Sequence, residues 1–160
     1  LLEHAVAVVS RERGETFNDL AFYFDNLALV RRGMGDLADA EVLLGKGLQA
    51  AQLHKHRNLA PIMVDLADVR CARGAVQEGL KLLEDARPIM AKAYPKDPWR
   101  LAWLDAIQAE CRLAQGEAPK ARALLQTSAP VIAKRWPRGS LYVARTIELV
   151  DRANRARRRG

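Results

Sequence analysis

Apolar residues recur along most of the chain at the three-to-four-residue spacing of an amphipathic helix. The first clear run extends from Phe22 to Met34, and its apolar positions include Phe24, Leu27, Ala28 and Val30. A second run with the same period follows from Leu37 to Leu48. Between them, Gly35 suits the left-handed conformation that ends many helices, and Asp36 is a favoured N-cap. The pattern predicts two helices that meet at a glycine turn, and no segment shows the sustained alternation of a β-strand.

Comparison of the chain with itself shows that this two-helix unit is repeated. When the sequence is shifted so that the turn glycine Gly74 falls on Gly116, other matched positions coincide as well. They are Leu82-Leu83 with Leu124-Leu125, Pro88 with Pro130, and Tyr94-Pro95 with Trp136-Pro137. A slightly smaller shift places Gly35 on Gly74 and Leu43-Leu44 on Leu82-Leu83. Agreement of core, turn and breaker positions in one register indicates an array of helical repeats.

The repeat pattern predicts an all-α fold, a right-handed solenoid of antiparallel helix pairs with about eight helices. We expect one domain. Its predicted parts are a partial repeat at 1–15, full repeats at 16–56, 57–95 and 96–137, and a C-terminal helix with a basic tail at 138–160. Because the sequence starts at Leu1 and not at methionine, we expect it to be a piece of a longer protein.

The spacing resembles the tetratricopeptide repeat (TPR). This repeat combines a large residue, a Leu-small pair, a turn glycine, and a small residue followed four positions later by Leu or an aromatic. In the first unit these residues are Phe24, Leu27, Ala28, Gly35, Ala40 and Leu44. In the second they are Met63, Leu66, Ala67, Gly74, Gly79 and Leu83. The third unit keeps Ala109, Gly116, Ala121 and Leu125, but Asp105 and Gln108 depart from the apolar pattern. The usual tyrosine of the repeat is replaced by Arg31, Arg70 and Arg112.

The long period, roughly 39 to 42 residues, and the Asn26-Leu27-Ala28 stretch are similar to the kinesin-light-chain type of these repeats. Bacterial signalling proteins also carry this type. The small residues predict close helix pairing of Ala28 with Ala40, Ala67 with Gly79, and Ala109 with Ala121.

Composition narrows the class of protein. The chain has 160 residues, of which 49 % are hydrophobic and 28 % charged, so it can bury a core. No apolar run approaches the ~20 residues that span a bilayer, so no contact with a membrane is expected. The formal net charge of +7 is uneven, because residues 103–160 carry 12 basic and 5 acidic side chains. Arg145, Arg152 and Arg155 form a possible basic patch for nucleic acid or an acidic partner, or a solvated C-terminus.

Motifs of enzymatic chemistry are missing from the sequence. It has no glycine-rich phosphate loop, no GxSxG elbow and no HExxH pair. His54 and His56 would point about 200° apart on a helix, so they do not suggest a metal site. Cys71 and Cys111 cannot form a disulfide framework, and each is expected to be a small buried hydrophobe. We predict that the protein is not an enzyme and needs neither a cofactor nor a metal.

The TPR resemblance implies that the first helices of the units line a concave groove. Six side chains are then expected on this surface: Asp25, Asn26, Arg32, Asp68, Trp103 and Glu110. Asp68 and Glu110 would form a weakly acidic strip for a basic partner. Trp103 either anchors that partner or packs against neighbours on the Phe22 side or against the next repeat. Some members of the family clamp a C-terminal carboxylate with a Lys/Asn set. Only Asn26 fits that set, and Asp25 and Asp65 would oppose it.

These observations predict a protein-interaction module that binds a peptide or a partner protein on its concave face. The resemblance suggests a cytoplasmic scaffold within a larger bacterial regulatory or signalling protein, and the low cysteine content fits a reducing compartment. Binding of nucleic acid or an acidic partner through the basic C-terminal third is the alternative, and of these nucleic acid is the less expected partner. The sequence indicates neither the identity of the partner nor the oligomeric state.

Overall fold

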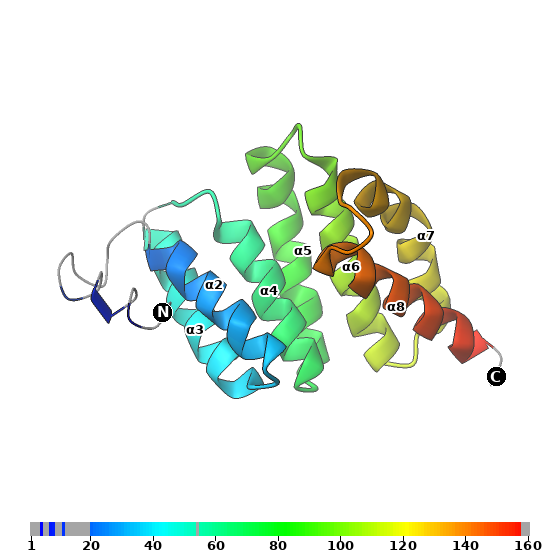
Figure 1. The fold of residues 1–160 in the computed structure, drawn as a ribbon, viewed down its shortest axis with the longest axis horizontal. Coiled ribbons are helices and arrows are strands. Elements are labelled where there is room, and N and C mark those ends of the chain that lie inside the picture. The colour runs from blue at the N-terminus through cyan, green and yellow to red at the C-terminus, as the bar shows by residue number, and fades with distance from the viewer. Residues whose placement is uncertain (1–3, 5–6, 9–10, 12–19, 54, 158–160) are drawn as a thin grey trace.

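In the part of the chain that the structure describes, seven α-helices follow one another across the molecule, from α2 at one end to α8 at the other (Figure 1). The computed structural model describes residues 4, 7–8, 11, 20–53 and 55–157, and this part of the chain contains no strand. The helices are α2 (Leu20–Gly33), α3 (Leu37–Leu53), α4 (Leu59–Ala72), α5 (Val76–Ala93), α6 (Pro98–Ala114), α7 (Ala118–Arg135) and α8 (Leu141–Arg157). The all-α fold predicted from the sequence is confirmed.

The three predicted glycine turns form as expected. Gly35, Gly74 and Gly116 have φ angles of +84°, +90° and +76°, a region that side chains with a Cβ rarely adopt. After each glycine, the next backbone N–H donates a 2.9 Å hydrogen bond back to the carbonyl five residues earlier, which is Arg31, Arg70 or Arg112. At the first turn, the Oδ1 of Asp36 accepts a bond of 3.3 Å from the N–H of Asp39, as an N-cap does.

Each helix pair is held at close range by the predicted small residues. A Cβ added to Gly79 on α5 would lie 2.9 Å from the carbonyl oxygen of Ala67 and 2.4 Å from the sulfur of Cys71, both on α4. The equivalent alanines of the other pairs are fully buried: Ala28, Ala40, Ala109 and Ala121. The pairing of Ala67 with Gly79 inferred from the sequence is therefore correct, and the backbones of α4 and α5 approach where the side chains are smallest.

Ion pairs occupy the place of the usual tyrosine of the repeat. Arg70 contacts Glu41 of α3 at 3.1 Å and Glu78 of α5 at 3.3 Å, so it joins two repeats. In the next unit, Arg112 contacts Glu117 at 2.8 Å, across its own glycine turn. The departure from the family pattern is thus a change from aromatic packing to charge pairing.

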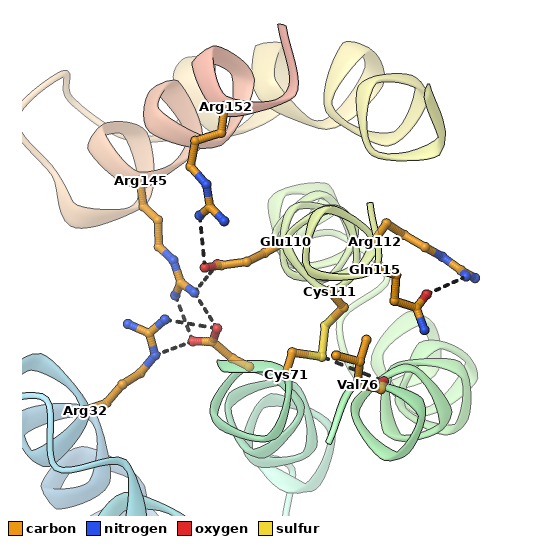
Figure 2. Close-up of a disulfide and its surroundings, with 10 residues drawn as sticks. Arg32, Cys71, Val76, Glu110, Cys111, Arg112, Gln115, Arg145 and Arg152 are labelled. Carbon is orange, nitrogen blue, oxygen red and sulfur yellow. Dashed lines mark hydrogen bonds and ion pairs between the residues drawn. A yellow bond between two sulfur atoms is a disulfide. The ribbon is translucent and has the colours of Figure 1, made fainter. Parts of the chain in front are cut away.

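Cys71 and Cys111 form a disulfide that joins α4 to α6 (Figure 2). Both residues are buried, as expected, but the prediction that they are only small hydrophobes is wrong. Their sequence separation of 40 residues is close to the repeat period, so they face each other on adjacent first helices. Disulfides persist mainly in oxidising compartments, and the cysteines therefore do not support a reducing one. A cytoplasmic location stays a prediction from the family resemblance.

Two predicted segments lie largely outside the described residues. They are the partial repeat at 1–15 and the end of the basic tail with Arg158 and Arg159. His54 also lies outside them. Among the residues that the structure does describe, we find no helix whose length and apolar character would let it cross a membrane.

Candidate functional site

The first helices of the repeats lie side by side and form one continuous surface. α2 contacts α4, α4 contacts α6, and α6 contacts α8. We call the surface of these four helices the first-helix face; it is the face predicted to be concave. The six predicted site residues come from three of these helices: Asp25, Asn26 and Arg32 from α2, Asp68 from α4, and Trp103 and Glu110 from α6.

Asp68 is the centre of an ion-pair network on this face. It is only 2 % exposed and is contacted by guanidinium groups from both sides. Arg32 of α2 lies with its Nε 2.6 Å from Oδ2, and Arg145 of α8 donates from Nη1 to the same oxygen at 2.8 Å. Arg145 is 77 residues away in sequence, so this contact connects the last helix with α4. A carboxylate buried this deeply is stable in its charged form only with such partners.

Glu110 extends the network along α6 and α8, as Figure 2 shows. The Nη2 of Arg145 donates to Glu110 as well as to Asp68, and Arg152 lies 3.5 Å from the second oxygen of Glu110. Burial lowers the pKa of Arg145, but its bonds to Asp68 and Glu110 outweigh this and raise the pKa above its ordinary value. Asp68 and Glu110, predicted as an acidic strip, are therefore bonded to Arg145 and Arg152, two of the three residues predicted as a basic patch.

Trp103 lies at the same junction. Its ring meets Tyr142 of α8 edge-on at a centroid distance of 4.8 Å, and the guanidinium carbon of Arg145 lies 5.5 Å from its centroid. Tyr142 also stacks on Trp136 at 4.9 Å. Of the two roles predicted for Trp103, the structure shows packing against the next repeat.

Two carboxylates share a hydrogen bond where α2 and α4 meet. Burial raises the pKa of Asp25 to about 6, and its hydrogen bond with Asp65 partly opposes that rise. The pKa of Asp65 is raised well above its ordinary value, first by burial and then by the charges of Asp25 and Asp68. The Oδ1 atom of Asp25 is buried and accepts no hydrogen bond. This pair therefore holds a proton more tightly than surface acids do.

The other predicted residues lie apart from the network. Asn26 donates a bond of 2.7 Å to the carbonyl of Phe22 within α2. Arg155 is exposed near the end of α8 and appears in none of these contacts. Phe22 and Leu29, which the sequence did not single out, are 50 % and 40 % exposed on the same face of α2 as Asn26.

Solved structures show the same architecture. The nearly identical TPR-like repeats of a kinesin-light-chain candidate from Podosopora anserina match 99 % of this chain and 76 % of their own, with a TM-score of 0.67 and 22 % identity. A single-substitution form of that protein matches over the same shares with a TM-score of 0.68 and 22 % identity. The chain has a TPR-like repeat fold. No protein-family model matches the sequence, and the comparison with curated proteins gives no match either.

The TPR-like fold explains which functional residues the sequence could identify. Asp68 and Glu110 were found because equivalent positions stack in register along a solenoid. The sequence predicts a separate basic patch for Arg145, because its contact with Asp68 depends on the reach of one long side chain and not on the repeat period. The pairing of Cys71 with Cys111 could have been inferred, since their separation of 40 residues places them on neighbouring first helices.

Proposed function

We propose that this chain is a protein-interaction module that binds a peptide or a partner helix on its first-helix face. The observation that carries the proposal is the arrangement of that face, where the side chains of neighbouring helices are fixed in place by the Asp68 network. A surface that is ordered before binding loses less conformational entropy on association. The TPR-like fold supports this function because an array of repeats presents an extended surface.

The α2 end of the first-helix face is the best candidate for direct contact. Asp68 and Glu110 are already bonded to arginines of the chain, so a basic partner would have to displace Arg145 to reach them. The side chains of Phe22, Asn26 and Leu29 are available on α2, beside the Asp25–Asp65 pair. Apolar contacts next to a protonatable acid pair fit a peptide with apolar anchors and a basic or amide group.

The finer parts of the prediction rest on the family resemblance. These are a scaffold role in a larger bacterial regulatory or signalling protein and a cytoplasmic location. The prediction that the protein is not an enzyme rests instead on the missing catalytic motifs. The acidic pair and the ion network on the first-helix face support binding, whereas the aromatic cluster around Trp103 packs α6 against α8.

Peptide selection tests the proposal. Short peptides are first selected from a random library for binding to the wild-type chain. Their affinity is then measured for the wild type and for the double variant Phe22→Asp, Leu29→Asp. The matched control is Val42→Asp on α3, where Val42 is 59 % exposed on a second helix. We expect at least a tenfold loss of affinity in the double variant and none in the control, which corresponds to ~1.4 kcal/mol. Equal binding by both variants would place the peptide site elsewhere.

A further inference from the structure

A groove between α7 and α8 lies apart from the network of the first-helix face. It consists of two adjoining hollows of about 360 and 370 Å³ that share Ala129, Pro130 and Val150. Apolar side chains form most of its wall, including Leu125, Ile132, Val143 and Ile147. Ile147 on α8 is 53 % exposed.

The preceding repeat boundary has a polar hollow at the equivalent place. The shift that superimposes the second repeat on the third also relates Arg87, Asp105 and Gln108 to Ala129, Ile147 and Val150. Arg87 on α5 forms an ion pair with Asp105 on α6 and donates a bond of 3.2 Å to the side-chain oxygen of Gln108. The hollow there measures about 520 Å³. The same site has therefore changed from three interacting polar residues to three apolar ones.

The first repeat boundary is also apolar but is filled. Its equivalent residues are Leu48, Met63 and Leu66, and the last two are buried. Leu48 packs against the core clusters that contain them. At the α7–α8 boundary, Ala129 is too short to cover the apolar residues of α8. The groove is thus exposed because a small residue stands where Leu48 or Arg87 stands in the other boundaries.

A further helix packed as the existing second helices are would not cover this groove well. α5 approaches α4 closely because Gly79 fits against the backbone at Ala67. In the repeat register, Ala67 on α4 is equivalent to Ala109 on α6 and to Asp151 on α8. Asp151 is exposed, and a helix that approached α8 as α5 approaches α4 would bury its carboxylate without a partner. We therefore expect the groove to bind a segment that packs on α8 in a different orientation from that of α5 on α4.

Charge around the groove favours an acidic occupant. Arg122 lines one hollow and Arg138 lines the other, whereas Asp151 is the acid in the lining. Residues 103–160 carry 12 basic and 5 acidic side chains, which adds to the positive potential. Along α7, the lining residues extend from Arg122 to Ala133, about 17 Å or three helical turns.

We propose that the α7–α8 groove binds a short amphipathic helix of a partner protein, with large apolar side chains along one face and acidic residues at both ends. The apolar face would cover Ile147 and Val150, and the acidic ends would lie near Arg122 and Arg138. This surface is separate from the first-helix face, so both can be occupied at once and each can be tested without the other.

A designed peptide tests this proposal. The probe is a fluorescein-labelled helix of about four turns, with leucines on one face and glutamates at both ends, measured by fluorescence anisotropy. Two matched peptides replace its glutamates by lysines or its leucines by serines. We expect the acidic peptide to bind at least tenfold more tightly than either, and its binding to weaken at high salt. Failure of the acidic peptide to bind up to ~1 mM overturns the proposal.

Exchange of residues between the two boundaries locates the site. The triple variant Ala129→Arg, Ile147→Asp, Val150→Gln installs the polar set of the α5–α6 boundary and should reduce peptide affinity at least tenfold. The reverse set, Arg87→Ala, Asp105→Ile, Gln108→Val, should create a second peptide site. Val42→Asp is the control with unchanged affinity. If the triple variant fails to fold, as circular dichroism would show, Ile147→Asp alone replaces it, since this side chain is already exposed.

Two results would overturn the assignment. In one, the triple variant or Ile147→Asp binds the acidic peptide as tightly as the wild type does. In the other, a labelled single-stranded DNA of about 20 nucleotides binds tightly while the peptide does not, which would make the basic C-terminal third a nucleic-acid site.

Discussion

Charged side chains on the first-helix face form ion pairs and hydrogen bonds mainly with one another. Arg145 bonds to Asp68 and Glu110, and burial raises the pKa of Asp25 beside its hydrogen-bond partner Asp65. Periodicity predicted which face these residues occupy, because residues one repeat apart stack in register. It did not predict their bonds, because an arginine can reach several acids and its choice depends on burial and neighbours. The positions of the site residues could therefore be predicted, and their contacts could not.

The Asp25–Asp65 pair makes stability depend on pH. Since the folded-state pKa of Asp25 is raised from about 4 to about 6, the folded chain binds more protons at Asp25 than the unfolded chain does between these two pH values. The contribution of Asp25 to the free energy of unfolding therefore falls as the pH rises from about 4 to about 6. Asp65→Asn removes one charge and can donate a hydrogen bond to Asp25. We expect this variant to raise the free energy of unfolding by about 1–2 kcal/mol at pH 8, and by much less at pH 4.5.

Urea denaturation at the two pH values measures the effect. Glu148→Gln, at an exposed acid of α8, controls for the removal of one negative charge. The raised pKa values of the Asp25–Asp65 pair would be refuted if Asp65→Asn shifted stability equally at both pH values or lowered it at pH 8.

At the scale of helices, spacing is set by small residues and not by helix caps. The N-cap residues of α4, α5, α6 and α7 form no side-chain hydrogen bond to the first turn of the helix. Packing must therefore hold these helices in place. The sequence predicted the helix pairs well, because glycine turns and alanine contacts are local and repeat with the chain. It did not predict that α8 would bond to α4, since this contact depends on Arg145 and not on a position that recurs in every repeat.

Gly79→Ala tests the close approach of α4 and α5. The new Cβ would lie 2.4 Å from the sulfur of Cys71, which the bond to Cys111 holds in place, and 2.9 Å from a backbone oxygen. We expect the free energy of unfolding to fall by about 1–3 kcal/mol, despite the higher helix propensity of alanine.

The matched control is Gly45→Ala on α3, where a Cβ would meet nothing within 4 Å. This change should leave stability unchanged or raise it by up to about 1 kcal/mol. Chemical denaturation followed by circular dichroism measures both variants. Equal stability of the two would show that α4 and α5 are not in close contact at Gly79.

At the scale of the whole molecule, the array has two unlike ends. The α2 end presents apolar side chains beside a protonatable acid pair, and the α7–α8 end presents an apolar groove with arginines at its ends. Departures from the repeat pattern, such as Asp105 and Gln108 in one unit and Ala129 in the next, mark where one boundary differs from another. In a repeat protein, the residues that depart from the repeat pattern therefore indicate which boundaries are candidates for binding sites.

The Cys71–Cys111 disulfide also determines how the molecule yields when it is stretched. It closes a covalent loop over 40 residues that contains α5 and most of α6, and this loop cannot lengthen under tension. With an optical trap attached to both termini, full extension should be shorter by roughly 130 Å than in the presence of a reductant. An equal contour length under both conditions would show that the two cysteines are not linked. The intact chain would therefore behave under load as two extensible arms joined by an inextensible loop.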